Sequence, residues 1–219
     1  MPIAKGTERM VSILISIVVI SFISSFLISF LLAVFWQIAI FSIVVICCIF
    51  LIWDFRSPNR EIITDKNWIL APADGIIVEI EESEDSFFYV IRMSPFDVHM
   101  NRSPIDGVVK DIKFQKGSHW PVYFYNYAKK NQRNAITITN EEEDLEALVT
   151  QVSGIFARRT ISYVKKGDKV KQGEIIGTIR FGSITSLKIT SSKKYKLAQE
   201  CSTSVRAGLS ILANLKNSD

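Results

Sequence analysis

Residues 71–77 read APADGII, and residues 103–109 repeat the pattern as SPIDGVV. Each copy is a Pro-x-Asp-Gly turn that leads directly into β-branched residues, a combination typical of a tight turn followed by a strand. A pattern that returns in this way indicates an internal structural repeat. The two copies therefore predict a pseudo-symmetric β-sandwich.

The rest of the chain beyond Arg60 has the same character, because short β-branched and aromatic runs alternate with turn residues. The runs that predict strands are residues 76–78, 87–91, 135–139, 147–152 and 174–179. The acidic residues 141–144 predict a solvated hairpin connection. Residues 165–174 predict a further tight turn and resemble the hairpins of biotinyl and lipoyl carrier domains. We therefore expect a mostly β fold, a β-sandwich or hybrid-motif-like domain.

The N-terminal part of the chain has a different composition. No charged residue occurs between Met10 and Trp53, and as one helix this stretch would measure roughly 66 Å, about twice the hydrocarbon core of a bilayer. We therefore expect a transmembrane helical hairpin, with spans at residues 11–30 and 38–53 and a turn at Trp36 and Gln37. One long tilted helix, a hairpin that is only half inserted and a cleavable signal peptide are the alternatives.

Charge and cysteine content limit the partners and the compartment. Positive residues flank the apolar stretch at both ends, at Lys5, Arg9, Arg56 and Arg60, which predicts a cell (inner) membrane protein whose globular part faces the cytoplasm. The net charge of +4 includes no long basic run, so we expect no nucleic-acid partner. The three cysteines form no disulfide or metal-binding pattern.

These observations predict two parts, a membrane anchor at residues 1–55 and a globular domain at residues 56–219. Few side chains in the globular part are suited to acid–base chemistry near neutral pH, because His99 and His119 are the only histidines. No zinc-binding motif, G-x-S-x-G motif or glycine-rich phosphate loop occurs, so we expect no metal. Taken alone, Gly182-Ser183 indicates only a turn.

Five segments taken together are more informative than any one alone. In order and rough spacing they resemble the short-form phosphatidylserine decarboxylase family, and they are residues 71–75, 94–104, 131–134, 154–159 and 180–183. The similarity spans about residues 54–183, and the apolar hairpin also fits the family. It implies a carboxy-lyase of phospholipid biosynthesis, which converts a phosphatidylserine-type lipid to the phosphatidylethanolamine type with release of carbon dioxide.

The resemblance further implies a proenzyme that cuts its own backbone between Gly182 and Ser183. The Ser183 hydroxyl attacks the Gly182 carbonyl and converts the amide to an ester, and removal of the Ser183 α-proton then expels the Gly182 carboxylate. The dehydroalanine that remains tautomerises to an imine, whose hydrolysis by water releases ammonia and leaves a pyruvoyl group at position 183, the one cofactor implied. Its ketone accepts the electrons released as carbon dioxide leaves the serine headgroup.

The resemblance also implies roles for individual residues. For the processing base we expect His99, oriented by Asp74, since a carboxylate fixes the imidazole tautomer. Longer relatives carry a second histidine where this chain has Arg102, so reprotonation of the decarboxylated carbon is the alternative role for His99. We expect Arg102 and Arg133 to bind the phosphodiester or carboxylate of the lipid through their planar guanidinium groups.

Partners and activity retain alternatives. The implied partners are a serine-headed phospholipid in the bilayer, diacyl or archaeal ether, and the two cleavage fragments as a heterodimer; further oligomerisation is open. The family pattern has an arginine after the scissile serine, whereas residues 184–187 here read ITSL. A processing-dead lipid-binding relative and a non-enzymatic membrane adaptor are therefore the competing hypotheses.

Overall fold

A computed structural model describes residues 6–28, 34–121, 130–155, 159–179 and 183–216. The chain divides into two compact units, Met1–Pro58 and Asn59–Asp219.

The first unit is a pair of apolar helices, α1 (Glu8–Ile28) and α2 (Val34–Asp54). Both are long and apolar enough to cross a membrane, and the rings of Phe22 and Phe41 pack edge to face with centroids 5.5 Å apart. The expected hairpin is confirmed. The turn expected at Trp36 and Gln37 is wrong, because both residues lie inside α2; neither Trp nor Gln interrupts a helix.

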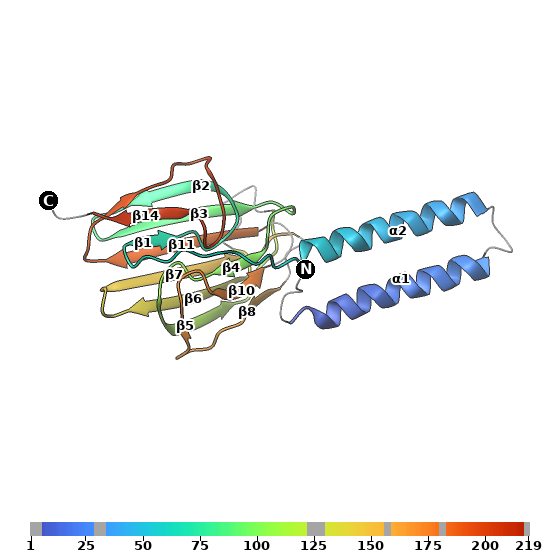
Figure 1. Cartoon of the computed structure of the whole chain (residues 1–219), viewed down its shortest axis with the longest axis horizontal. Coiled ribbons are helices and arrows are strands. Elements are labelled where there is room, and N and C mark those ends of the chain that lie inside the picture. The colour runs from blue at the N-terminus through green and yellow to red at the C-terminus, as the bar shows by residue number, and fades with distance from the viewer. Residues whose placement is uncertain (1–5, 29–33, 122–129, 156–158, 180–182, 217–219) are drawn as a thin grey trace. The chain divides into compact units, whose positions relative to one another are not determined.

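The second unit is built from strands joined mainly by short turns (Figure 1). An eight-stranded antiparallel sheet has the order β13-β2-β3-β11-β7-β6-β5-β9, and two three-stranded sheets have the orders β1-β14-β12 and β4-β10-β8. The large sheet contains β2 (Gly75–Glu82), β3 (Ser86–Met93), β5 (Gly107–Gln115), β6 (Arg133–Asn140), β7 (Leu145–Val152), β9 (Lys169–Val170), β11 (Ser183–Ser191) and β13 (Ser204–Val205). The small sheets contain β1 (Trp68–Leu70), β4 (Met100–Arg102), β8 (Thr160–Ser162), β10 (Ile175–Ile179), β12 (Tyr195–Leu197) and β14 (Ile211–Leu215).

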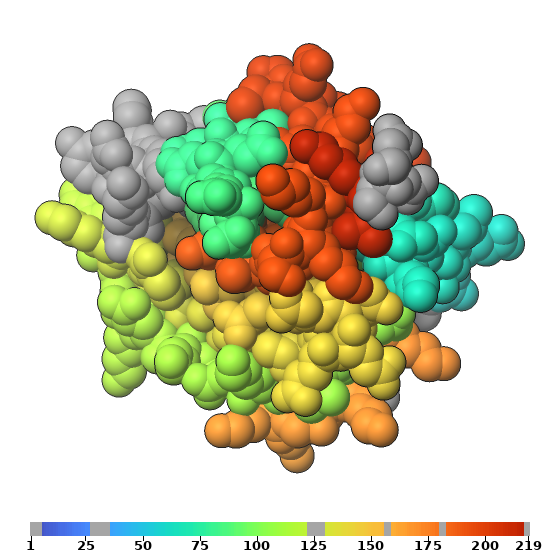
Figure 2. Space-filling view, turned by 90° about the vertical axis from the view of Figure 1, so that its left-hand side faces the viewer, coloured from blue at the N-terminus to red at the C-terminus, as the bar shows by residue number. Residues whose placement is uncertain are grey.

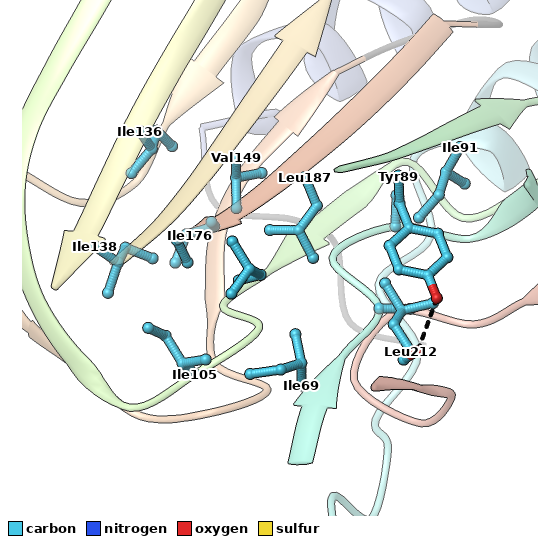
Figure 3. Packing of buried hydrophobic residues seen from close by; sticks show 14 of the residues in the cluster. Ile69, Tyr89, Ile91, Ile105, Ile136, Ile138, Val149, Ile176, Leu187 and Leu212 are labelled. Atoms are coloured by element: carbon cyan, nitrogen blue, oxygen red, sulfur yellow. Dashed lines mark hydrogen bonds between the residues drawn. The ribbon is translucent and has the colours of Figure 1, made fainter. Parts of the chain in front are cut away.

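The small sheets pack against one face of the large sheet, and the core lies between them (Figure 3). Leu187 and Val149 contribute to the core from the large sheet, whereas Ile69 and Ile176 contribute from the small sheets, and all four are fully buried. Burying each such side chain stabilises the fold by roughly 1.5–3 kcal/mol. The predicted mostly β sandwich, its strand runs and the hairpin connection at residues 141–144 are confirmed.

The repeated turns occupy equivalent places in the sandwich. Gly75 begins β2 and Gly107 begins β5. A Cβ added to Gly75 would lie 2.3 Å from a carbonyl oxygen of the neighbouring strand, and a Cβ added to Gly107 would lie 2.5 Å from one. The preceding aspartates are also equivalent, since Asp74 accepts a hydrogen bond from the backbone N–H of Ala207 and Asp106 from that of Gln172, both at 2.8 Å. The sequence repeat is therefore a structural one.

Candidate active site

Ser183 is the first residue of β11 and has no solvent-exposed surface. It pairs with Met93, the last residue of β3, and its hydroxyl lies 3.3 Å from the Met93 sulfur. The Thr185 hydroxyl lies 3.5 Å from the same sulfur. Gly182, the expected partner in cleavage, lies outside the described residues. The backbone on the C-terminal side of the expected scissile bond is therefore fixed by sheet pairing.

A row of buried polar side chains crosses the core face of the sheet beside Ser183. Thr185 on β11 pairs with Gln151 on β7, which pairs with Asn134 on β6. From the facing small sheet, the Asn101 amide donates to the Thr185 hydroxyl at 3.0 Å, and the Gln151 amide donates to the Asn101 carbonyl oxygen at 2.7 Å. Asn134 donates to the Gln151 carbonyl oxygen at 2.9 Å. The sandwich core is thus polar at the Ser183 end.

His99 is 2% exposed and is held through its backbone. Its carbonyl oxygen accepts hydrogen bonds from the Thr178 hydroxyl at 2.8 Å and from the Ile179 N–H at 3.2 Å. Because Met93 pairs with Ser183 and His99 bonds to Ile179, the segment 93–99 is attached to the chain on both sides of residues 180–182. The segment that leads to His99 is thus connected to Ser183 through Met93 and to Ile179 through His99 itself.

Asp74 forms a second cluster. Both of its carboxylate oxygens accept hydrogen bonds from Arg60 at 2.7 Å, and both side chains of this ion pair are almost fully buried. The expected role of Asp74 in orienting His99 stays a prediction. The repeat-equivalent residue, Asp106, is exposed and accepts a hydrogen bond from the backbone N–H of Gln172. The ion pair with Arg60 is therefore what distinguishes Asp74 from an ordinary turn aspartate.

Arg102 belongs to the same cluster. Its guanidinium donates to the carbonyl oxygen of Gly173 at 2.7 Å. Burial lowers the pKa of Arg102 below its usual value, repulsion from Arg60 lowers it further, and Asp74 opposes both effects. A buried cation of this kind is costly unless anions are near. Arg102 is thus close to Asp74.

Arg133 is placed differently. It pairs with Val152, and Val152 pairs with Ile184, so Arg133 lies two strands from the residue that follows Ser183. It is partly exposed. These strand pairings place Arg133 on the same cross-strand row as Ile184. Arg102, the other arginine expected to bind substrate, lies in the Asp74 cluster instead.

Comparison with known proteins decides the family. The family model described as phosphatidylserine decarboxylase matches residues 48–213. The chain belongs to the phosphatidylserine decarboxylase family. The expectation of an enzyme of this family, made as a proenzyme and acting in phospholipid metabolism, is confirmed, and the two apolar helices indicate membrane association.

Individual relatives of this decarboxylase cover most of its length. A phosphatidylserine decarboxylase proenzyme of Carboxydothermus hydrogenoformans is 34% identical over 77% of this chain and 81% of its own. One from Amoebophilus asiaticus is 35% identical over 78% of both chains. An archaetidylserine decarboxylase proenzyme of Methanosarcina mazei is 35% identical over 74% of both. Relatives named for phosphatidylserine and relatives named for archaetidylserine are thus about equally similar to this chain.

The polar row and the role of Arg60 were not predicted from the sequence. A signal for the row was present, because the buried positions of β7 read Leu145, Ala147, Val149 and then Gln151. A polar residue that continues an inward-facing apolar alternation marks a polar patch inside the sandwich. Arg60 had been counted only as a positive charge flanking the membrane segment, and no spacing linked it to Asp74.

Proposed function

We propose that this decarboxylase cuts its own chain between Gly182 and Ser183, converts Ser183 into a pyruvoyl group, and decarboxylates a serine-headed phospholipid. The observation that carries the proposal is the setting of Ser183. It is fully buried at the start of a central strand and beside a polar row, and it pairs with Met93, which begins the segment that leads to His99. Family membership supports the same chemistry.

The fixed surroundings of Ser183 suit a nucleophile that attacks its own backbone. Sheet pairing holds Ser183 on one side of the scissile bond, and the Ile179–His99 hydrogen bond holds the chain on the other side. An attack of this kind depends on position, because well-oriented neighbouring groups react far faster than free ones. We assign His99 as the base that takes the proton and Asp74 as the residue that orients it, with Arg60 holding the Asp74 carboxylate in place.

The residues around position 183 fit a pyruvoyl group. The site is fully buried, and the neighbouring Thr185 and Asn101 supply polar groups on the core side. The bound group supplies a ketone that condenses with the substrate amine and accepts electrons as carbon dioxide leaves. We assign Arg133 and Arg102 to binding of the lipid phosphodiester or carboxylate, since each guanidinium can donate two parallel hydrogen bonds.

The two units have separate tasks in this proposal. The helical unit, for which we expect the bounds 1–55, anchors the enzyme in the cell (inner) membrane. The β unit faces the cytoplasm, because the positively charged residues that flank a membrane span favour that side. Tethering keeps the enzyme on the surface that contains its substrate and so replaces a search through solution. After cleavage, the two fragments form a heterodimer.

The test is carbon dioxide release from carboxyl-labelled lipid in vesicles that contain the full-length chain. The natural chain is expected to release label from a diacyl phosphatidylserine, an archaetidylserine, or both, which also identifies the lipid class. Ser183→Ala is expected to release none. Ser186→Ala serves as the matched control, because Ser186 lies on the same strand but points to the opposite face of the sheet. Cleavage without release from either lipid would contradict the proposed reaction.

A further inference from the structure

The loops at the Ser183 end of the β unit carry exposed apolar side chains. Phe96 is 64% exposed, Trp120 is 53% exposed and Ile155 is 46% exposed. An isolated exposed apolar residue needs no explanation, but several gathered on one surface mark an interaction site.

Strand register places these three loops together. Met93, which precedes the Phe96 loop, pairs with Ser183. Val152, which precedes the Ile155 loop, pairs with Ile184. The Trp120 loop is tied to the Ile155 loop through Asn131, whose amide donates to the carbonyl oxygens of Trp120 at 2.9 Å and of Ser153 at 2.7 Å.

Charge differs between the two ends of the large sheet. In the described parts of these three loops and next to them lie five basic residues, Arg92, Lys116, Lys130, Arg133 and Arg159. The carboxylate of Asp97 also lies there and accepts a hydrogen bond from the backbone N–H of Ser94. At the opposite end, the turns 83–85 and 141–144 contain six carboxylates in seven residues. Figure 2 looks onto this opposite end, with the first turn in green and the second in yellow. Within it, Glu143 pairs with Lys66 and Lys193.

We propose that the Ser183 end of the β unit docks on an anionic lipid bilayer, with Phe96, Trp120 and Ile155 inserted at the interface. Trp and Phe favour the headgroup level of a membrane. Basic residues around them are attracted to anionic lipid, while the acidic turns are repelled and point away. This membrane contact is additional to the one that the helical pair makes. It rests on the proposed function only in its purpose, which is to bring a lipid headgroup to Ser183.

The surface is tested by site-specific fluorescence in the full-length chain with its three natural cysteines replaced by alanine. An environment-sensitive label is placed at Phe96→Cys or Trp120→Cys, with Glu84→Cys and Glu142→Cys as controls at the opposite end. In phosphatidylglycerol-containing vesicles, lipids with a spin label near the headgroup are expected to quench the first pair at least twice as strongly as the second. Equal quenching at all four positions would overturn the proposal.

Two further comparisons separate this contact from the anchor and from catalysis. Phe96→Ser is expected to reduce quenching of the label at position 120, whereas Val108→Ser, an exposed apolar residue near the opposite end, is expected to leave it unchanged. All measurements are repeated with Ser183→Ala. Quenching that persists in this uncleaved variant supports the docking surface even if decarboxylation fails, and quenching that depends on cleavage contradicts it.

Discussion

At the scale of single residues, the polar row beside Ser183 is the feature on which positioning of the site depends. Gln151 joins Asn101 on one sheet to Asn134 on its own, and it has no exposed surface. Buried amides stabilise a fold only when their hydrogen bonds are complete. The row therefore fixes Thr185, two residues beyond the proposed scission.

Replacing Gln151 with leucine is expected to destabilise the chain and slow cleavage. Two buried groups would lose their partners, at about 1–3 kcal/mol each, so the free energy of unfolding should fall by roughly 2–6 kcal/mol. Urea unfolding in detergent and a cleavage time course on denaturing gels measure the two effects. Thr150→Val, on the opposite face of β7, is the matched control. Cleavage at the natural rate in Gln151→Leu would show that the row does not position the site.

Tyr89 makes the stability of the folded chain depend on pH in the alkaline range. Its hydroxyl donates to the Leu212 carbonyl oxygen at 2.8 Å (Figure 3), and burial raises the pKa of Tyr89 to about 12. An unfolded tyrosine has a pKa near 10. The stabilisation is therefore complete below about pH 10 and is lost as the pH rises toward about 12.

Tyr89→Phe removes this dependence. Between pH 9 and 11.5 the natural chain is expected to lose up to about 2 kcal/mol more stability than the variant, since one pKa unit corresponds to about 1.4 kcal/mol. Urea midpoints at both pH values provide the measurement. Tyr195, whose pKa burial also raises, is present in both proteins and cancels in the comparison. Parallel losses in the two proteins would contradict a buried, neutral Tyr89.

At the scale of elements, the repeated turn connects sequence to fold most directly. Gly75 has a φ of +146°, and a Cβ there would lie 2.3 Å from the Arg92 carbonyl oxygen. Both the dihedral angle and the close approach require glycine. The strand that begins at Gly75 is paired with β3, whose last residue pairs with Ser183.

Gly75→Ala is therefore expected to prevent folding or to leave the chain uncleaved. Gly167→Ala is the control, because Gly167 also has a positive φ, of +92°, but no atom lies within 4 Å of its Cβ position. That control should cost only about 1–2 kcal/mol. Protease resistance of the solubilised chains distinguishes the two. Equal resistance of both variants would mean that backbone contact at Gly75 is unimportant.

The strands and the candidate site differed in how far they could be predicted. The runs 87–91 and 147–152 alternate in polarity or are rich in β-branched residues, which is a local property, and both became strands as predicted. The partner of Asp74 could not be predicted, since Arg60 is fourteen residues away and the contact depends on the path of the chain between them. The turn at Trp36 was misplaced because apolar helices carry no local stop signal.

At the scale of the whole molecule, the proposed cleavage divides a continuous sheet. β11 lies between β3 and β7 and pairs with each along its length, β14 pairs with β1, and β13 pairs with β2. The fragment that begins at Ser183 therefore contributes a strand, β11, that has a hydrogen-bonded neighbour on each side. Cutting one peptide bond leaves all of these ladders in place.

The fragments are expected to remain together under native conditions. Size-exclusion chromatography in mild detergent should give one peak that contains both, and only denaturant should separate them. Ser183→Ala, which stays uncut in the proposal, provides the reference elution volume. Release of the small fragment on dilution without denaturant would contradict the central position of β11.

The intact mass of the purified full-length chain tests scission at Ser183 most directly. The account predicts two polypeptides, residues 1–182 and a fragment from 183 whose mass is that of a chain beginning with a pyruvoyl group, and one uncut polypeptide for Ser183→Ala. A folded natural chain that keeps the mass of residues 1–219 would contradict it.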